Sequence, residues 1–320
     1  MGRCIAISSY SFGYVAPNPM VGAVLVYDNR VIAEGYHRVF GGAHAEVEAL
    51  LKVKDSGVLE KCTLYVSLEP CNHYGKTPPC SEMIVSSKIP RVVVAAQDPF
   101  EKVNGSGIER LKNAGVDVVV GIMEKEAREL NRRFFTFHEK RRPYVILKWA
   151  QTEDNFIDRI RTKEEKPLPI SNNIAHVLSH KWRTQESAIL VGTNTAIMDN
   201  PSLTARLWDG RNPTRVAIDV KDVLPYTLKI FVEDAPTLVL SQSNLEDWML
   251  ELHKRNIQSV MVEGGARLLQ SFIEKNMWDE ARIFTSTKRI GSGVGSPKIS
   301  GRVVSQDVLE DDVLTVLRNL

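Results

Sequence analysis

The sequence predicts an α/β protein built from two folding units. Apolar runs of strand length alternate with amphipathic runs of helix length along the chain, and the alternation restarts after a charged, proline-containing stretch at residues 139–144. A chain of 320 residues also exceeds the usual size of one hydrophobic core. We therefore predict domains at 1–142 and 143–320, each an α/β layer with helices on both faces of its sheet.

The first half begins with a predicted hairpin. The apolar runs on either side of Asp28, Asn29 and Arg30 indicate two strands joined by a polar turn. The elements expected after it are a helix at 45–55, a strand at 63–70, a helix at 80–89, a strand at 91–96, a helix at 107–115, a strand at 116–121 and a long helix at 124–140.

The second half shows a different order of elements. A fresh strand is expected at 144–150, directly after the domain boundary. The elements expected after it are a helix at 172–185, strands at 188–192, 214–220 and 237–241, a helix at 244–256, a strand at 259–264, a helix at 266–276 and a strand at 280–287.

Composition limits the classes of partner. The 41 basic and 39 acidic residues leave a formal charge of +2, which is too near balance to indicate a nucleic-acid partner. The longest apolar runs are only long enough for strands, so we expect no membrane span. The first residues lack the basic and apolar regions of a secretion signal, and four cysteines without one are typical of a reducing compartment. We therefore expect a cytoplasmic protein.

His44, Cys71 and Cys80 form a predicted metal site. Zinc favours nitrogen and sulfur ligands, and a catalytic zinc site keeps one position open for water. Glu46 has the matching task, because a carboxylate beside that water can take its proton and pass it to a leaving nitrogen. Residues two apart on a helix point in different directions, so we expect His44 at or just before the first turn of the 45–55 helix.

Taken singly, these residues have simpler explanations: His44 as a capping or packed histidine, and the cysteines as small apolar residues. As a set, H-x-E followed by P-C and a further cysteine on a loop matches the zinc deaminase signature. The match of the whole set therefore favours the metal site. One departure is the spacing of the two cysteines, which eight residues, "NHYGKTPP", separate where that signature has two.

The motifs "APNPMVGAVLV", "HAE" and "LEPCNHYGKTPPC" resemble the deaminase domain of the bifunctional riboflavin biosynthesis enzymes. In that family a cytidine-deaminase-like three-layer domain is followed by a dihydrofolate-reductase-like α/β domain. The motifs "HKWRTQESAILVGTNTAIMDNPSLTAR" and "VEGGARLLQSF" resemble the reductase half, so that the resemblance covers nearly the whole chain. It implies zinc-dependent hydrolytic deamination of a 2,5-diamino-6-(phosphoribosylamino)pyrimidinone, then NADPH-dependent reduction of the ribosyl group to ribityl.

The resemblance also implies roles for individual residues. His44, Cys71 and Cys80 match the zinc ligands, and Glu46 matches the proton shuttle. The positions that match substrate contacts are Asn18, His37, Lys76, Arg183, Leu203, Arg206 and Glu263, and those that match NADPH contacts are Ala150, Thr195, Asp199 and Gly265. Lys148 aligns with a lysine near the reacting carbon. The implied partners are the small phosphoribosylaminopyrimidine substrate and a second copy bound through the reductase domain.

Some positions depart from the family pattern. Glu48 stands where a histidine is common, Asn155 replaces a glycine, Pro169 a tryptophan and Val220 a serine. No G-x-G-x-x-G dinucleotide motif is present. The departures at Asn155, Pro169 and Val220 leave open a second interpretation, in which the deaminase is active and the reductase half acts only as a scaffold.

Other interpretations also remain open. The same zinc chemistry would serve a deaminase of nucleosides or of transfer RNA bases. His176 and His180 lie four residues apart as a metal pair would, but no third ligand accompanies them, so we expect a surface or packing role. The stretch 132–142 interleaves aromatic and basic residues as RNA-binding segments do, yet a helix with one packed side explains it better.

Overall fold

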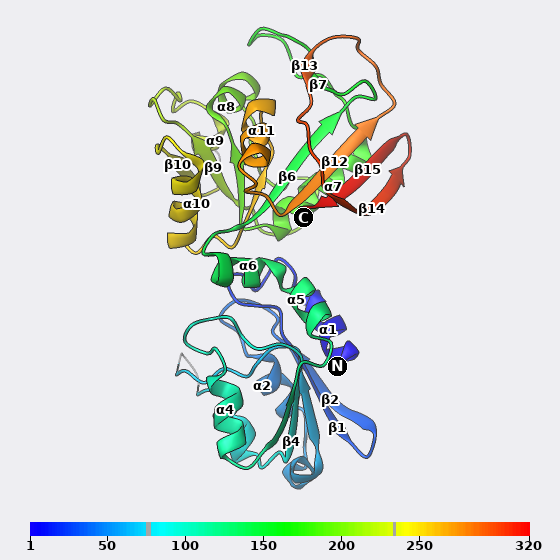
Figure 1. The fold of residues 1–320 in the computed structure, drawn as a ribbon, viewed down its shortest axis with the longest axis vertical. Helices are drawn as coiled ribbons and strands as arrows, with labels where there is room; N and C mark the ends of the chain where they lie inside the picture. The colour runs from blue at the N-terminus through cyan, green and yellow to red at the C-terminus, as the bar shows by residue number, and fades with distance from the viewer. Residues whose placement is uncertain (75–77, 233–234) are drawn as a thin grey trace. The chain divides into compact units, whose positions relative to one another are not determined.

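The computed structural model describes residues 1–74, 78–232 and 235–320. The predicted substrate contact Lys76 lies outside the described residues. The chain forms two compact units, Met1–Arg141 and Arg142–Leu320 (Figure 1). Among the described residues, the helices are all too short or too polar to cross a membrane.

The first unit contains one five-stranded sheet in the order β2-β1-β3-β4-β5. Its strands are β1 (Gly22–Tyr27), β2 (Arg30–Tyr36), β3 (Thr63–Val66), β4 (Arg91–Val94) and β5 (Asp117–Val120). The predicted hairpin is confirmed: β1 and β2 are antiparallel, and Asp28 and Asn29 between them have φ of 47° and 58°, as a two-residue hairpin turn requires. β3, β4 and β5 are mutually parallel, so their carboxyl ends meet at one edge of the sheet.

Helices cover both faces of this sheet. They are α1 (Gly2–Ser8), α2 (Ala45–Leu50), α3 (Cys80–Ser86), α4 (Ser106–Asn113), α5 (Glu124–Leu130) and α6 (Arg132–Lys140), with short 3-10 turns η1 (Ser9–Ser11) and η2 (Ser56–Lys61). Ala49, Ile84 and Leu111 bring α2, α3 and α4 into one buried cluster with the strands. On the other face, Ile7 of α1 packs near Val24 of β1. The predicted three-layer arrangement is therefore present.

One predicted helix is wrong. The pattern of residues 124–140 indicated a single long helix, but the structure has α5 and α6 with a break at Asn131. The buried side chain of Asn131 accepts a hydrogen bond from the Met20 amide and donates one to the Met20 carbonyl, each at 2.8 Å. A partner 111 residues away thus interrupts a locally favourable helix.

The second unit contains an eight-stranded sheet in the order β10-β9-β8-β11-β6-β12-β15-β14. Its strands are β6 (Tyr144–Gln151), β8 (Ala188–Val191), β9 (Thr214–Ile218), β10 (Thr237–Leu240), β11 (Ser259–Val262), β12 (Glu280–Ser286), β14 (Arg302–Leu309) and β15 (Asp312–Arg318), and β7 (Phe156–Asp158) pairs separately with β13 (Val294–Gly295). The six strands from β10 to β12 are parallel, whereas the C-terminal hairpin β14–β15 is antiparallel and was not expected from the sequence.

Alternating residues of the central strand β6 build two cores. Val145, Leu147 and Trp149 face one cluster, and Tyr144 and Ile146 face the other. The helices of this unit are α7 (Asn173–Gln185), α8 (Thr193–Asp199), α9 (Lys229–Val232), α10 (Leu245–Lys254) and α11 (Ala266–Glu274). α10 and α11 pack into the first cluster, and α7, α8 and α9 pack into the second. Helices on both faces are thus confirmed.

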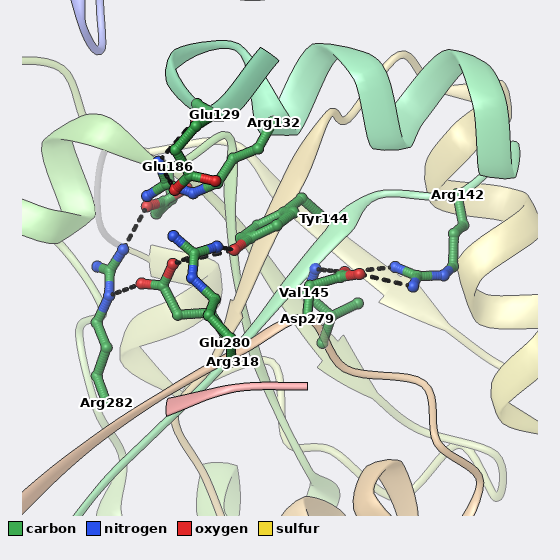
Figure 2. A network of polar contacts seen from close by, with 10 residues as sticks. All are labelled: Glu129, Arg132, Arg142, Tyr144, Val145, Glu186, Asp279, Glu280, Arg282 and Arg318. Carbon is green, nitrogen blue, oxygen red and sulfur yellow. Dashed lines mark hydrogen bonds and ion pairs between the residues drawn. The ribbon is translucent and has the colours of Figure 1, made fainter. Parts of the chain in front are cut away.

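A buried polar network ties β12 to β15 and β6 (Figure 2). Glu280 pairs with Arg282 at 2.6 Å and with Arg318 at 3.3 Å, and it accepts a hydrogen bond from the Tyr144 hydroxyl at 3.0 Å. Arg282 also lies 3.4 Å from Glu186. Because each buried charge has an opposite partner, this network fixes the start of β12 without leaving an isolated ion.

Candidate active sites

The three predicted metal ligands of the first unit come together. His44 is the N-cap of α2, Cys71 lies in the loop after β3, and Cys80 is the first residue of α3. His44 Nδ1 is 3.3 Å from Cys80 Sγ and 3.6 Å from Cys71 Sγ, and one donor atom of each residue lies within 4.8 Å of the others. The expected position of His44, just before the first helical turn, is confirmed.

The two thiols of the cluster have opposite pKa shifts. The hydrogen bond with Cys80, and then the contact with His44, lower the pKa of Cys71 to about 4. The hydrogen bond between His44 and Cys71 in turn raises the pKa of His44. Hydrogen bonding to Cys71 and burial raise the pKa of Cys80. Thiolate is the form that binds zinc.

Glu46 adds a carboxylate to this cluster. It is 3% exposed, and its Oε2 has no hydrogen-bond partner among the described residues. Burial, followed by the charge on Cys71, raises the pKa of Glu46 to about 7. One nitrogen and two sulfur donors lie within mutual reach, beside a buried carboxylate oxygen that has no hydrogen-bond partner in the described part of the chain. This set fits a zinc ion that keeps one position open. A carboxyl whose pKa is near neutral can both take and give a proton.

Asn18 and His37 adjoin the same cluster. The His37 ring lies 5.6 Å from the His44 ring, its Nδ1 is 2.9 Å from the Ala43 carbonyl oxygen, and its Nε2 is 3.1 Å from Asn18 Nδ2. Burial lowers the pKa of His37, which favours the neutral ring. Its Nδ1–H then donates to Ala43 and its Nε2 accepts from Asn18. The structure therefore brings Asn18, His37 and Glu46 together with the three ligands.

Sequence reasoning missed Glu69. This residue is 4% exposed, and its carboxylate accepts hydrogen bonds from four backbone amides. The only signal in the sequence was an acidic residue between an apolar strand and the P-C motif. Its partners, which are 29 to 39 residues further along the chain, give no local pattern.

Five predicted residues of the second unit lie near or after the carboxyl ends of parallel strands. Lys148 and Ala150 lie near the end of β6, Thr195 is in α8 directly after β8, and Glu263 and Gly265 follow β11. β8, β11 and β6 are adjacent and parallel, so these residues reach the same edge of the sheet. That edge is where open α/β sheets bind ligands.

A buried charged group lies at this edge. Arg183 pairs with Glu263 through two hydrogen bonds, of 3.0 and 2.7 Å, and donates to the Thr204 carbonyl at 3.0 Å. Burial alone would raise the pKa of Glu263, but the charges of Arg183 and Lys148 outweigh it and lower that pKa to about 2. Burial lowers the pKa of Lys148, and Glu263 partly offsets this effect. Such a group can bind hydroxyl and phosphate oxygens of a ligand.

His180 holds the loop that carries two further predicted contacts. Its Nδ1 accepts a hydrogen bond of 2.8 Å from the backbone amide of Arg206, and Leu203 in the same loop has φ of 55°. His176 is exposed, and within the described residues His44, Cys71 and Cys80 are the only group of three that could hold a metal. The exposed position of His176 and the buried, backbone-bonded position of His180 agree with the surface or packing role expected from the sequence.

Thr195 packs closely on the glycines after β11. A Cβ on Gly264 would lie 2.8 Å from Thr195 Cγ2, and Gly265 has φ of 67° and is the N-cap of α11. The first amides of a helix are free to bind phosphate, so this cradle fits the pyrophosphate of a dinucleotide. Asp199, at the other end of α8, forms an ion pair with Arg161.

The family departures have different structural consequences. Asn155 has φ of 64°, and its amide donates to the Thr152 carbonyl at 3.0 Å. Asparagine tolerates this left-handed conformation better than other non-glycine residues, so the turn between β6 and β7 survives the loss of glycine. The carbonyl of Pro169 accepts a hydrogen bond from Lys288, and Val220 is half exposed after β9.

Comparison with known proteins gives matches to both units. Residues 1–96 match the family model described as the cytidine and deoxycytidylate deaminase zinc-binding region, and residues 143–314 match the RibD C-terminal domain. The riboflavin biosynthesis protein RibD of Aquifex aeolicus is 36% identical over 331 residues, covering 96% of this chain and 92% of that protein. The homologue of Bacillus amyloliquefaciens is also 36% identical, covering 94% and 87%.

Solved structures agree over the full length. A diaminohydroxyphosphoribosylaminopyrimidine deaminase/5-amino-6-(5-phosphoribosylamino)uracil reductase from Thermotoga maritima is 36% identical, with a TM-score of 0.89 over 100% of this chain and 97% of that one. RibD of Acinetobacter baumannii is 30% identical, with a TM-score of 0.92 and the same coverage. The chain therefore belongs to the RibD family of bifunctional deaminase/reductases of riboflavin biosynthesis.

Proposed function

We propose that residues 1–142 form the deaminase and residues 143–320 the reductase, acting in turn on one phosphoribosylaminopyrimidine. The substrate class comes from the Thermotoga relative, whose name joins a diaminohydroxyphosphoribosylaminopyrimidine deaminase to a phosphoribosylaminouracil reductase. The observation that carries the proposal is the cluster of His44, Cys71 and Cys80 beside Glu46, whose buried Oε2 has no hydrogen-bond partner in the ranges 1–74, 78–232 and 235–320. A purely structural metal site would give that buried carboxyl no task.

In the deaminase, His44, Cys71 and Cys80 would hold zinc, which supplies Lewis-acid activation of the attacking water. Glu46 takes a proton from that water and delivers it to the amino nitrogen that leaves the ring. Asn18 presents an amide to the base, and His37 keeps that amide oriented through its contact with Asn18 Nδ2. Lys76 would bind the phosphate of the substrate.

The RibD reductase domain implies a nicotinamide cofactor, and we propose NADPH. The cradle of Thr195 and Gly265 supports binding of its phosphates, with Ala150 and Asp199 as further contacts. Arg183, Leu203, Arg206 and Glu263 would bind the substrate, where the paired carboxylate of Glu263 suits the ribosyl hydroxyls and Arg206 suits the phosphate. Lys148 lies within the charged group, where it would be near the carbon that receives hydride.

We propose that the chain acts as a homodimer through its reductase domain, in the cytoplasm. The edge strand β14 supports a dimer, because its side chains of Val303, Val304 and Val308 are exposed by 57%, 50% and 77%. An exposed apolar edge strand is a ready site for pairing with another strand. Four free cysteines support a reducing compartment.

The test compares Glu46→Gln with Glu48→Gln. Both residues lie in α2, but Glu48 pairs with Arg38 and has no role in the proposed chemistry. We expect Glu46→Gln to lower the deamination rate about 10²- to 10⁴-fold, the usual contribution of a positioned acid–base group, with zinc content unchanged. Glu48→Gln should keep normal deamination, and reduction of the deaminated compound should be normal in both. Near-normal deamination by zinc-loaded Glu46→Gln would contradict the assignment.

A further inference from the structure

We propose that Glu69 is a positioning residue of the metal site, which fixes Cys71 by fastening residues 69–72 to the first turn of α4. The inference rests on the proposed metal site and adds to it a residue that does not touch the metal. Glu69 is two residues before Cys71, on the loop that leaves β3. Its carboxylate reaches the loop after β4 and the start of α4.

Glu69 is fully used as an acceptor. Oε2 accepts from the amides of Asp98 at 3.1 Å and Gly105 at 2.9 Å. Oε1 accepts from the amides of Gly107 at 2.9 Å and Ile108 at 3.2 Å. The Glu69 amide in turn donates to the Ala96 carbonyl at 2.9 Å. Because four backbone amides donate to this one carboxylate, they hold the Glu69 side chain in a single orientation.

The residues on either side of Cys71 are fastened to the same turn. A Cβ on Gly107 would lie 2.0 Å from the Pro70 carbonyl oxygen, so the two backbones touch at a distance that only glycine permits. Asn72 Nδ2 donates to the Ser106 carbonyl at 3.2 Å. Cys71 is thus held between two residues that both contact α4.

The first residues of α3 also hold Cys71. The Cys71 carbonyl accepts from the Ser81 amide at 3.1 Å, and Cys71 Sγ accepts from the Cys80 amide at 3.3 Å. The spacing between the two thiols therefore depends on where α4 holds the loop relative to α3. If Glu69 releases its amides, the Cys71 thiol loses one of the two supports that set this spacing.

Only a carboxylate suits this position. It offers two oxygens that are both acceptors, whereas an amide of the same size offers one oxygen and an NH₂ group. In Glu69→Gln, the NH₂ group would face two backbone N–H groups, which are donors. One pair of amides would lose its acceptor, and the loop would shift to relieve the contact.

The experiment measures the metal site directly in the full-length protein. The visible spectrum of Co²⁺-loaded protein reports the geometry at the thiolates, and the release of Zn²⁺ to a coloured chelator reports how firmly it is held. We expect Glu69→Gln to alter the Co²⁺ spectrum and to release zinc about 10- to 100-fold faster, the usual cost of removing an outer support. Glu34→Gln is the matched control, because Glu34 pairs with Arg3 on the surface of the same unit.

The outcomes separate the two proposals. A Co²⁺ spectrum and zinc release rate in Glu69→Gln that equal those of the wild type and Glu34→Gln would overturn the positioning role. A wild-type protein that takes up neither ion would instead overturn the metal site itself. If Glu69→Gln does not fold, Asn72→Ala removes a milder contact of the same loop and should shift both readouts in the same direction. An unchanged Asn72→Ala would then count against the proposal.

Discussion

Two side chains of α7 hold the loop that carries Leu203 and Arg206. Arg183 donates to the Thr204 carbonyl, and His180, one turn earlier, accepts from the Arg206 amide. Burial, aided by the charges of Arg183 and Arg206, lowers the pKa of His180 to about 4. The ring is therefore neutral at pH 7 and can accept, whereas a protonated ring would set an N–H against the Arg206 amide.

We predict that His180 makes the protein less stable in mild acid. The unfolded histidine has a pKa near 6.5, above the folded value of about 4, so between these pH values the unfolded chain binds more protons. Stability from this residue is present above pH 6.5 and is lost as the pH falls toward 4. His180→Asn removes the titration and retains an acceptor at the amide oxygen. Urea unfolding at pH 7 and pH 5 should show a smaller acid-induced loss in the variant; equal losses would contradict this account.

Among the secondary structure elements, the break between α5 and α6 shows the limit of local pattern. Residues 124–140 have continuous helical periodicity. The residues around Asn131 give no sequence signal that its side chain binds the backbone of Met20. The β14–β15 hairpin was missed because β14 is exposed along most of its length and so lacks the alternation of a half-buried strand. β6 was predicted because it is buried on both faces and so has a continuous apolar run, and α11 was predicted because its apolar residues recur on one helical face.

We predict that Asn131→Ala destabilises the first unit. The substitution leaves the amide and the carbonyl of Met20 without the partner that each has at 2.8 Å, and both groups are buried. A buried polar group that loses its partner costs about 1–3 kcal/mol, so the free energy of unfolding should fall by at least that amount. Denaturant unfolding measures this change. Asn113→Ala, at the exposed end of α4, is the control; an equally small effect of both variants would refute the role of Asn131.

At the scale of the whole molecule, each unit has its own sheet, its own core and its own site. The cluster of His44, Cys71 and Cys80 with Glu46 was predictable, because a few chemically distinctive residues fall at fixed spacings. Glu69 and His180 were not, because each binds backbone amides that are distant in the sequence and carry no side-chain signature. The departure at Asn155 weakened the sequence argument for a live reductase, but its backbone conformation removes that objection at this position.

We infer that one chain performs both steps. The most direct test is mass analysis of the products that the zinc-loaded, full-length protein makes from the diaminopyrimidinone phosphoribosyl substrate, with and without NADPH. We predict replacement of one amino group by oxygen in the first reaction, and the same change plus addition of two hydrogens in the second. A deaminated but unreduced product in the presence of NADPH would make the second unit a scaffold. No change in either reaction would contradict the account as a whole.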